Sequence, residues 1–126
     1  MTALTQSPTM GDVLKYSENP NYTNEAVTLL TGTSYKVGSV LGKITASGKY
    51  TLAADGAVDG SAVAVAVLLT ATDATAADTT GVILARGPAI VSKAALVFDA
   101  TVNDAPKTAT KHAELTTALI VPRSSA

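Results

Sequence analysis

The sequence contains no cysteine and no tryptophan, and aromatic side chains make up only 4% of its 126 residues. Without cysteine, the chain cannot form disulfides, thiolate metal sites or a cysteine nucleophile. Charge is also scarce, because nine Lys and Arg residues stand against ten Asp and Glu residues and give a net charge of -1. The basic residues are scattered, so we expect no direct binding of nucleic acid. The length fits a single domain.

A long hydrophobic run is missing as well, although 47% of the residues are hydrophobic and the mean hydropathy is +0.29. The longest apolar run, Ala62 to Leu69, is much shorter than the roughly 20 residues that cross a bilayer. The first residues, Met1 to Gly11, carry neither a basic region nor an apolar stretch, so we expect no signal peptide. The apolar content therefore serves a core of small aliphatic side chains or contacts with other proteins, and we expect no membrane partner.

The N-terminal part of the chain has the character of an extended arm. Residues 1–11 carry no charged side chain and show no helical or strand periodicity, and the Asn-Pro-Asn of residues 19–21 favours turns or extended backbone. We predict that residues 1–25 form an arm without a core of its own, followed by a β-rich domain over residues 26–126. Two interpretations stay open: the arm is disordered in the isolated protein, or it is a strand that adds to a sheet edge on another molecule.

Short β-type runs begin at residue 26. The pattern predicts a strand over residues 26–30 and a hairpin that pairs residues 37–45 with residues 50–52, because the Ser47–Gly48 turn lets the glycine adopt a positive φ. Residues 62–69 alternate alanine with valine in their first part and are apolar throughout. Both faces of this segment are apolar, so we predict a strand that is buried on both sides.

The second half of the chain alternates polar and β-type segments. Residues 73–80 are polar and predict a loop or a short helical turn. Strands are predicted over residues 81–86 and 89–91, joined at Gly87–Pro88, because proline cannot donate a hydrogen bond to a ladder. Residues 94–99 fit a strand and a helix equally well.

One convincing helix is predicted late in the chain. Residues 107–119 are rich in Ala, Lys, Glu and Leu. Asn103 or Asp104 can cap this helix, and Pro106 suits its first turn. A last strand is predicted over residues 118–121, followed by a polar tail.

The residues that could carry chemistry do not converge. His112 is the one histidine of the chain, so it has no second imidazole with which to share a metal, and we expect a solvated side chain on the polar helix. Residues 38–43 lack one residue of a phosphate-binding loop, and Ile44 replaces its Ser or Thr. Asp55 and Asp59 fit turns better than a calcium loop. We therefore predict no catalytic residue, no cofactor and no metal, and hence no enzyme.

All four tyrosines fall in the first half of the chain, at Tyr16, Tyr22, Tyr35 and Tyr50. Tyrosine offers a large contact area with a polar tip, so we expect these side chains to anchor protein interfaces. Tyr35 and Tyr50 are the two aromatic candidates in the predicted domain for stacking on a sugar ring. A β-rich receptor- or carbohydrate-binding module of a phage or bacterial surface is therefore the alternative function.

Seven segments, taken in order, carry a family resemblance that spans almost the whole chain. Together they resemble the lambda-type head-decoration proteins of tailed phages. The segments are Asp12–Tyr16, Asn19–Thr23, Val27–Leu29, Gly38–Thr45, Gly48–Tyr50, Asp59–Ser61 and Val82–Ala89.

The resemblance implies a mainly β, mixed α+β fold that is β-tulip-like, with short strands and one late α-helix. It implies a structural virion protein that binds as a homotrimer to three-fold or quasi-three-fold sites of the expanded capsid and stabilises the capsid against the pressure of packaged DNA. Its partners would be the major capsid protein and further copies of itself, and it would be made in the host cytoplasm and lie on the outer surface of the phage head.

The resemblance also suggests which residues make these contacts. The arm would join strands of the major capsid protein through its larger side chains, namely Leu4, Met10, Val13, Leu14, Tyr16 and Tyr22. Residues near the Gly87–Pro88 junction are the candidates for the trimer interface, namely Pro88, Ala89 and Ile90. Apolar residues of the last predicted strand, over residues 118–121, are further candidates.

Overall fold

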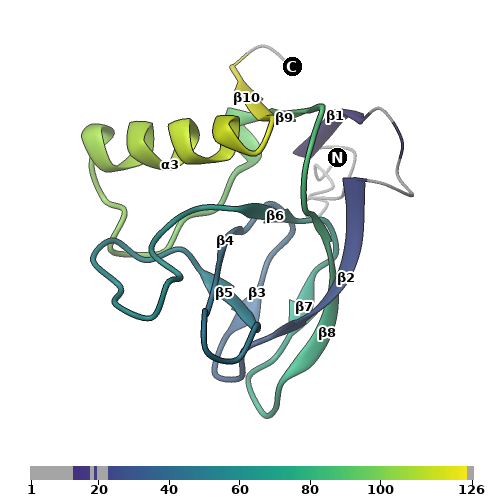
Figure 1. Cartoon of the computed structure of the whole chain (residues 1–126), viewed down its shortest axis with the longest axis vertical. Helices are drawn as coiled ribbons and strands as arrows, with labels where there is room; N and C mark the ends of the chain where they lie inside the picture. The colour runs from purple at the N-terminus through teal and green to yellow at the C-terminus, as the bar shows by residue number, and fades with distance from the viewer. Residues whose placement is uncertain (1–12, 18, 20–22, 125–126) are drawn as a thin grey trace, which may run out of the picture.

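The fold of the chain is small and β-rich in the computed structural model, which describes residues 13–17, 19 and 23–124. Its strands are short, and one α-helix follows late in the chain, as the sequence predicts (Figure 1). The elements are β1 (Leu14–Ser17), β2 (Asn24–Leu29), β3 (Ser34–Tyr35), β4 (Val40–Lys43), β5 (Tyr50–Leu52), β6 (Ala66–Leu68), β7 (Thr72–Asp73), β8 (Thr79–Leu84), β9 (Ala89–Ser92), the 3-10 helix η1 (Lys93–Ala95), α3 (Ala105–Thr117) and β10 (Ile120–Arg123).

Five strands close into a barrel in the order β2-β5-β4-β6-β8. The predicted hairpin of β4 and β5 is confirmed, with Gly42 opposite Thr51 and a positive φ at Gly48. The longest pairing joins β2 to β8 along their whole length in antiparallel register. A single parallel pair, Leu29 with Tyr50, closes the barrel between β2 and β5.

A second sheet, which we call the outer sheet, has the order β1-β9-β10. Strand β1 is antiparallel to β9, and β10 is parallel to β9. The outer sheet and α3 lie together at one end of the barrel (Figure 1). Strands β3 and β7 form a separate two-stranded pair.

Apolar side chains form two clusters, one on each face of the barrel wall. The barrel core fills the interior and consists of Leu29, Tyr35, Leu41, Ala66, Leu68, Ala74 and Ile83. The junction core lies between the barrel, the outer sheet and α3, and includes Val13, Val40, Val67, Leu84, Val91, Leu115 and Ile120. In β6, Val67 belongs to one cluster and its two neighbours to the other. The prediction of a strand buried on both sides is therefore confirmed for residues 66–68.

The same prediction is wrong for residues 62–65, which lie outside any strand. Helix α3 supplies the hydrogen bonds that a neighbouring strand would have given. The Lys111 ammonium donates to the Ala62 carbonyl, and the Ala64 N–H donates to Glu114 Oε1 at 3.0 Å. The Ala62 carbonyl and the Ala64 N–H are thus satisfied without a neighbouring strand, whereas the Val65 N–H donates to the Leu41 carbonyl of β4 at 2.9 Å.

The polar segment 73–80 is also corrected, since strands occupy both of its ends. Asp73 pairs with Ser34 in the small β3–β7 pair, and β8 begins at Thr79. Gly81 therefore lies inside a strand instead of starting one. A Cβ at this glycine would come within 2.8 Å of Leu29 Cδ1, so the crowded barrel interior explains why the position has no side chain.

Helix α3 confirms the predicted helix and its cap with a shift of two residues at each end. Asp104 is the N-cap, and its side chain accepts a hydrogen bond from the Lys107 N–H at 2.9 Å. The helix stops at Thr117. The last strand is correspondingly later than predicted, and it includes Pro122 and Arg123, which the sequence had suggested belong to a polar tail.

Candidate functional site

Large apolar side chains are exposed along one line across the outer sheet. Tyr16 of β1 and Val121 of β10 both lie beside Ile90 of β9 in the strand register. Tyr16 is 51% exposed and Val121 is 39% exposed, while Ile90 is partly buried. We call these three residues the apolar row. Leu119, immediately before β10, is exposed as well.

The opposite face of the outer sheet packs on the junction core. Val13, Val91 and Ile120 are fully buried there, and Leu14 packs against the same cluster. The side chain of Val13 is therefore enclosed by its own domain, whereas Tyr16 is open to a partner. Three further arm residues of the sequence prediction, namely Leu4, Met10 and Tyr22, lie outside the described residues.

The Gly87–Pro88 junction is tied to the end of helix α3. The Gly87 N–H donates to the Ala118 carbonyl at 3.0 Å, and the Ala89 N–H donates to the Leu119 carbonyl at 3.1 Å. Of the three predicted interface residues, Pro88 is exposed and Ile90 belongs to the apolar row. The Ala89 side chain is buried in the junction core.

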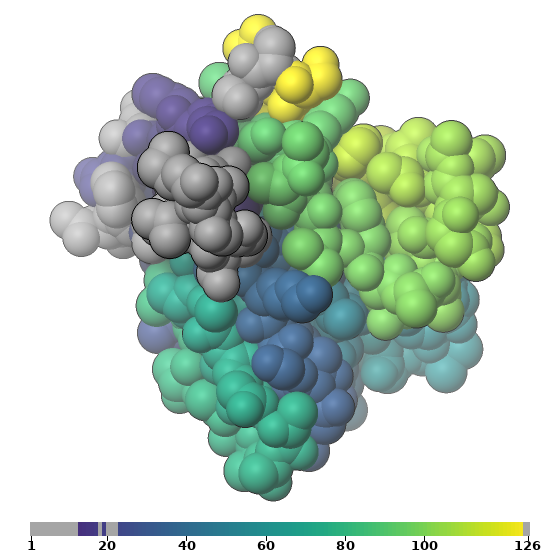
Figure 2. All heavy atoms as spheres, turned by 180° about the vertical axis from the view of Figure 1, so that it is seen from behind, coloured from purple at the N-terminus to yellow at the C-terminus, as the bar shows by residue number. Residues whose placement is uncertain are grey.

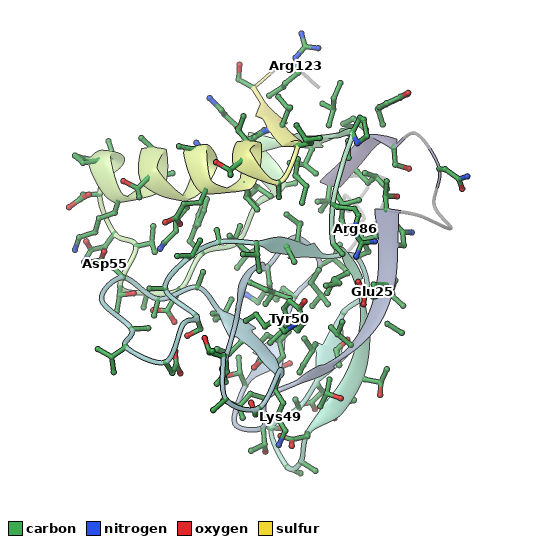
Figure 3. All side chains as sticks on the ribbon, viewed as in Figure 1. Glu25, Lys49, Tyr50, Asp55, Arg86 and Arg123 are labelled. Carbon is green, nitrogen blue, oxygen red and sulfur yellow. The ribbon has the colours of Figure 1, made fainter. Side chains whose placement is uncertain are left out.

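The charged side chains of the outer sheet are basic. Lys15 on β1 and Arg123 on β10 are the charged residues of its three strands, and Lys93 follows β9 directly. Arg123 extends beyond the end of β10, away from the rest of the molecule (Figure 3). The outer sheet therefore carries basic residues and no acidic ones, in a chain whose net charge is -1.

A comparison with protein-family models decides the family. Residues 3–120 match the model of bacteriophage lambda head decoration protein D. The chain belongs to this family. It is a structural protein that decorates the capsid of the virion, and the family is not a family of enzymes. No curated protein sequence matches the chain at a significant level.

Within the described residues, no three His, Asp or Glu side chains gather in a way that could hold a metal ion. In the same part of the chain, no helix has the length and apolar character needed to span a membrane.

The structure corrects the expectation that all four tyrosines anchor interfaces, because Tyr35 is buried in the barrel. Tyr35 is 2% exposed, and its hydroxyl donates to the Leu30 carbonyl at 2.7 Å inside the barrel. Tyr50 is partly buried, and this burial, together with the nearby Glu25 carboxylate, raises the pKa of its hydroxyl. Because Tyr35 offers no exposed ring, the sugar-binding alternative loses one of its two stacking candidates.

The expectation that His112 is fully solvated is wrong. Its ring lies 5.7 Å from the Phe98 ring, centroid to centroid, at an angle of 59°. The Nε2 atom is buried and has no hydrogen-bond partner among the described residues. Burial, with a further contribution from the positive charge of Lys93, lowers the pKa of His112.

Asp55 and Asp59, in the loop after β5, make contacts within the loop and with neighbouring segments. Asp59 accepts a hydrogen bond from the Ser61 N–H at 3.0 Å, and hydrogen bonds from Ser61 lower the pKa of this carboxyl. The Asp55 N–H donates to Thr101 Oγ1 at 2.8 Å, and the Asp55 carboxylate lies 3.6 Å from the Lys107 ammonium. These contacts confirm the structural interpretation of both residues.

The sequence pointed to the apolar residues of the last strand as candidates for the trimer interface, but it did not single out Val121. The signal was present in the last strand, where apolar residues continue past the first inward side chain, Ile120. A strand that buries Ile120 must turn Val121 to the opposite face. Because all four residues of the predicted strand 118–121 are apolar, the sequence alone did not show which of them face outward.

Proposed function

We propose that this head decoration protein forms a homotrimer at three-fold or quasi-three-fold sites of the expanded capsid. From the outer surface of the head it stabilises the shell against the pressure of packaged DNA, after synthesis in the host cytoplasm. The observation that carries this proposal is the family match over residues 3–120. The exposed apolar row and the edge position of β1 in the outer sheet support the proposal. They also suggest where the contacts lie.

The apolar row is the proposed contact between subunits. An exposed apolar stripe on a rigid sheet favours a protein partner, because its burial removes apolar surface from water. Pro88 and Ile90 remain candidates for this interface, and Tyr16 and Val121 join them. The partner is a second copy, since identical subunits around a three-fold axis present the same surfaces in turn.

The segment that precedes β1 is the proposed contact with the major capsid protein. Strand β1 lies at one edge of the outer sheet, and Tyr16 of this strand belongs to the apolar row. A trimer presents three such arms. Weak strand additions by each arm then combine through effective concentration into tight attachment.

The contact between subunits is tested by Val121→Asp. A carboxylate in a buried apolar contact is left without a partner, so we expect self-association about 10- to 100-fold weaker than in the parent protein. Sedimentation analysis over a range of concentrations measures this change. Val58→Asp is the matched control, because Val58 is fully exposed on a loop outside the outer sheet, and it should leave the trimer intact. A parent chain that is monomeric at micromolar concentration would overturn the proposed trimer.

The arm is tested by deleting residues 1–11 and measuring attachment to expanded empty capsids. We expect attachment to be lost while the mass of the trimer is retained, because the domain itself is unchanged. A control that replaces residues 1–11 by a Gly/Ser segment of equal length separates the effect of the arm's side chains from that of its length. Undiminished attachment of the deletion variant would contradict the role of the arm.

A further inference from the structure

Helix α3 contacts the region of the outer sheet at two places. At its C-terminal end, the carbonyl groups of Ala118 and Leu119 accept hydrogen bonds from the start of β9. Nearer its middle, His112 packs against Phe98, which follows β9 and η1 in the chain. In Figure 2 the green atoms of this region lie between the purple atoms of β1 and the yellow-green atoms of α3. The helix is therefore joined to the chain before and at the start of β9 and, through Phe98, to the segment that follows η1.

The surroundings of the contact between His112 and Phe98 favour a neutral imidazole. Phe98 packs against the junction core, and the neighbouring Val97 forms a bridge with Ser39 that fixes its backbone. On the other side of the contact, the buried Nε2 of His112 meets no hydrogen-bond partner among the described residues. A proton on this atom would add a charge in a place that offers it neither water nor an acceptor.

The charged groups around His112 do not compensate for such a proton. Lys93, on the neighbouring η1, is positive and disfavours the protonated ring. Asp99, which follows Phe98, accepts hydrogen bonds from the N–H and hydroxyl of Thr101. On α3 itself, Lys111 and Glu114 bind the segment 62–64.

Lys107, the remaining charged side chain of α3, lies near Asp55 and Asn103 instead of the imidazole. Among these charged groups, Lys93 on η1 is therefore the one whose charge affects the protonation of His112. Both the buried nitrogen and this charge favour the neutral ring.

We propose that His112 is an acid-sensitive latch that holds helix α3 against the region after β9, and that its protonation weakens the contact between subunits. The second part rests on the proposed function, because it assumes that the apolar row on β9 is the subunit interface. At neutral pH the latch is closed. Acidification opens it by charging a ring whose surroundings suit only the neutral form.

The direction of the pH effect follows from the lowered pKa of His112. The unfolded chain binds a proton near the ordinary value of about 6.5, whereas the folded chain binds it only at lower pH. Stability is therefore complete above the unfolded pKa and falls as the pH drops below it, until the folded form is protonated too. The lowered pKa values of Asp59, Asp73 and Asp78 act at more acidic pH, around and below their ordinary range.

The test begins with proton NMR of the full chain, because a single histidine makes the imidazole signals unambiguous. We expect an imidazole pKa clearly below the value in an unfolded reference, and a value equal to or above that reference would overturn the latch. Thermal unfolding at pH 7.5 and pH 5.0 is the second measurement. The midpoint of the parent protein should fall by about 2–6 °C, and His112→Leu should lose most of this difference.

Lys93→Gln is an independent variant that leaves His112 in place. It removes the neighbouring positive charge, so the imidazole pKa should rise and the loss of stability at pH 5.0 should shrink. Parallel pH curves of stability for the parent and His112→Leu would overturn the latch.

Sedimentation at the same two pH values tests the contact between subunits separately. A parent trimer that weakens at pH 5.0, together with a His112→Leu trimer that does not, supports the second part of the proposal. A chain that is monomeric at pH 7.5 overturns the proposed trimer, while the NMR titration still decides the latch.

Discussion

Replacing Lys111 by alanine is expected to destabilise the fold by about 3–5 kcal/mol, the cost of breaking a buried ion pair by removing one partner. Lys111 is 3% exposed although it lies on a helix rich in polar residues. Its ammonium donates to the Ala62 carbonyl and lies 3.4 Å from Glu114 Oε1. In Lys111→Ala, the carbonyl and the carboxylate both lose this partner. Urea unfolding followed by circular dichroism measures the change.

A second variant on the same helix makes this expectation specific. Lys107 pairs with Asp55 near the surface, and Lys107→Ala should cost less than about 1 kcal/mol, as is usual for exposed pairs. Glu114→Gln in the Lys111→Ala background removes the stranded charge and should recover part of the lost stability. Equal losses of unfolding free energy for Lys107→Ala and Lys111→Ala would show that the buried ammonium contributes no more to stability than the exposed one.

Gly87→Ala is expected to cost about 3 kcal/mol, because it overpacks a tight contact and breaks hydrogen bonds as well. A Cβ at this position would lie 1.7 Å from the Leu119 carbonyl oxygen and 2.7 Å from the Ala89 nitrogen. Both are backbone atoms that cannot rotate away, so the start of β9 must separate from the chain before β10. The variant should therefore lose both stability and, with its outer sheet displaced, self-association.

Gly56→Ala is the matched control for this substitution. A Cβ at Gly56 meets no atom within 4 Å, but the residue has a positive φ of 80°. The backbone strain alone should cost about 1–2 kcal/mol, and the proposed trimer should persist. Urea unfolding and sedimentation of both variants separate the two effects. If Gly87→Ala is no worse than Gly56→Ala, the close approach of the two chain segments is not important for the outer sheet.

Local patterns predicted much of the fold. The cap at Asp104 and the turn at Gly48 both depend on neighbouring residues, and the structure confirms them. The family could be recognised because its short segments occur in one order along nearly the whole chain. The start of β8 was misplaced because Gly81 resembles a strand boundary, whereas the barrel interior requires a glycine inside the strand.

The environment of α3 could not be predicted in the same way. Lys111 and His112 are typical of a solvated helix face, and their burial depends on segments far away in the sequence. The ammonium is accommodated because an irregular loop presents a carbonyl, and the imidazole because Phe98 lies beside it. Pairings between residues so distant have no local signature, since they depend on how the barrel closes. The apolar row likewise needs the registers of three strands before it becomes visible.

The strands of the outer sheet come from distant parts of the chain, and this has a consequence for folding. Leu14 pairs with Val91, and Val91 with Pro122, so the sheet joins parts of the chain that are far apart in sequence. Each pairing requires the closure of a long loop, and such non-local contacts slow folding. The apolar row does not exist until all three strands have met. A partly folded chain therefore lacks the surface proposed for self-association, and only subunits that have completed their topology could enter the proposed trimer.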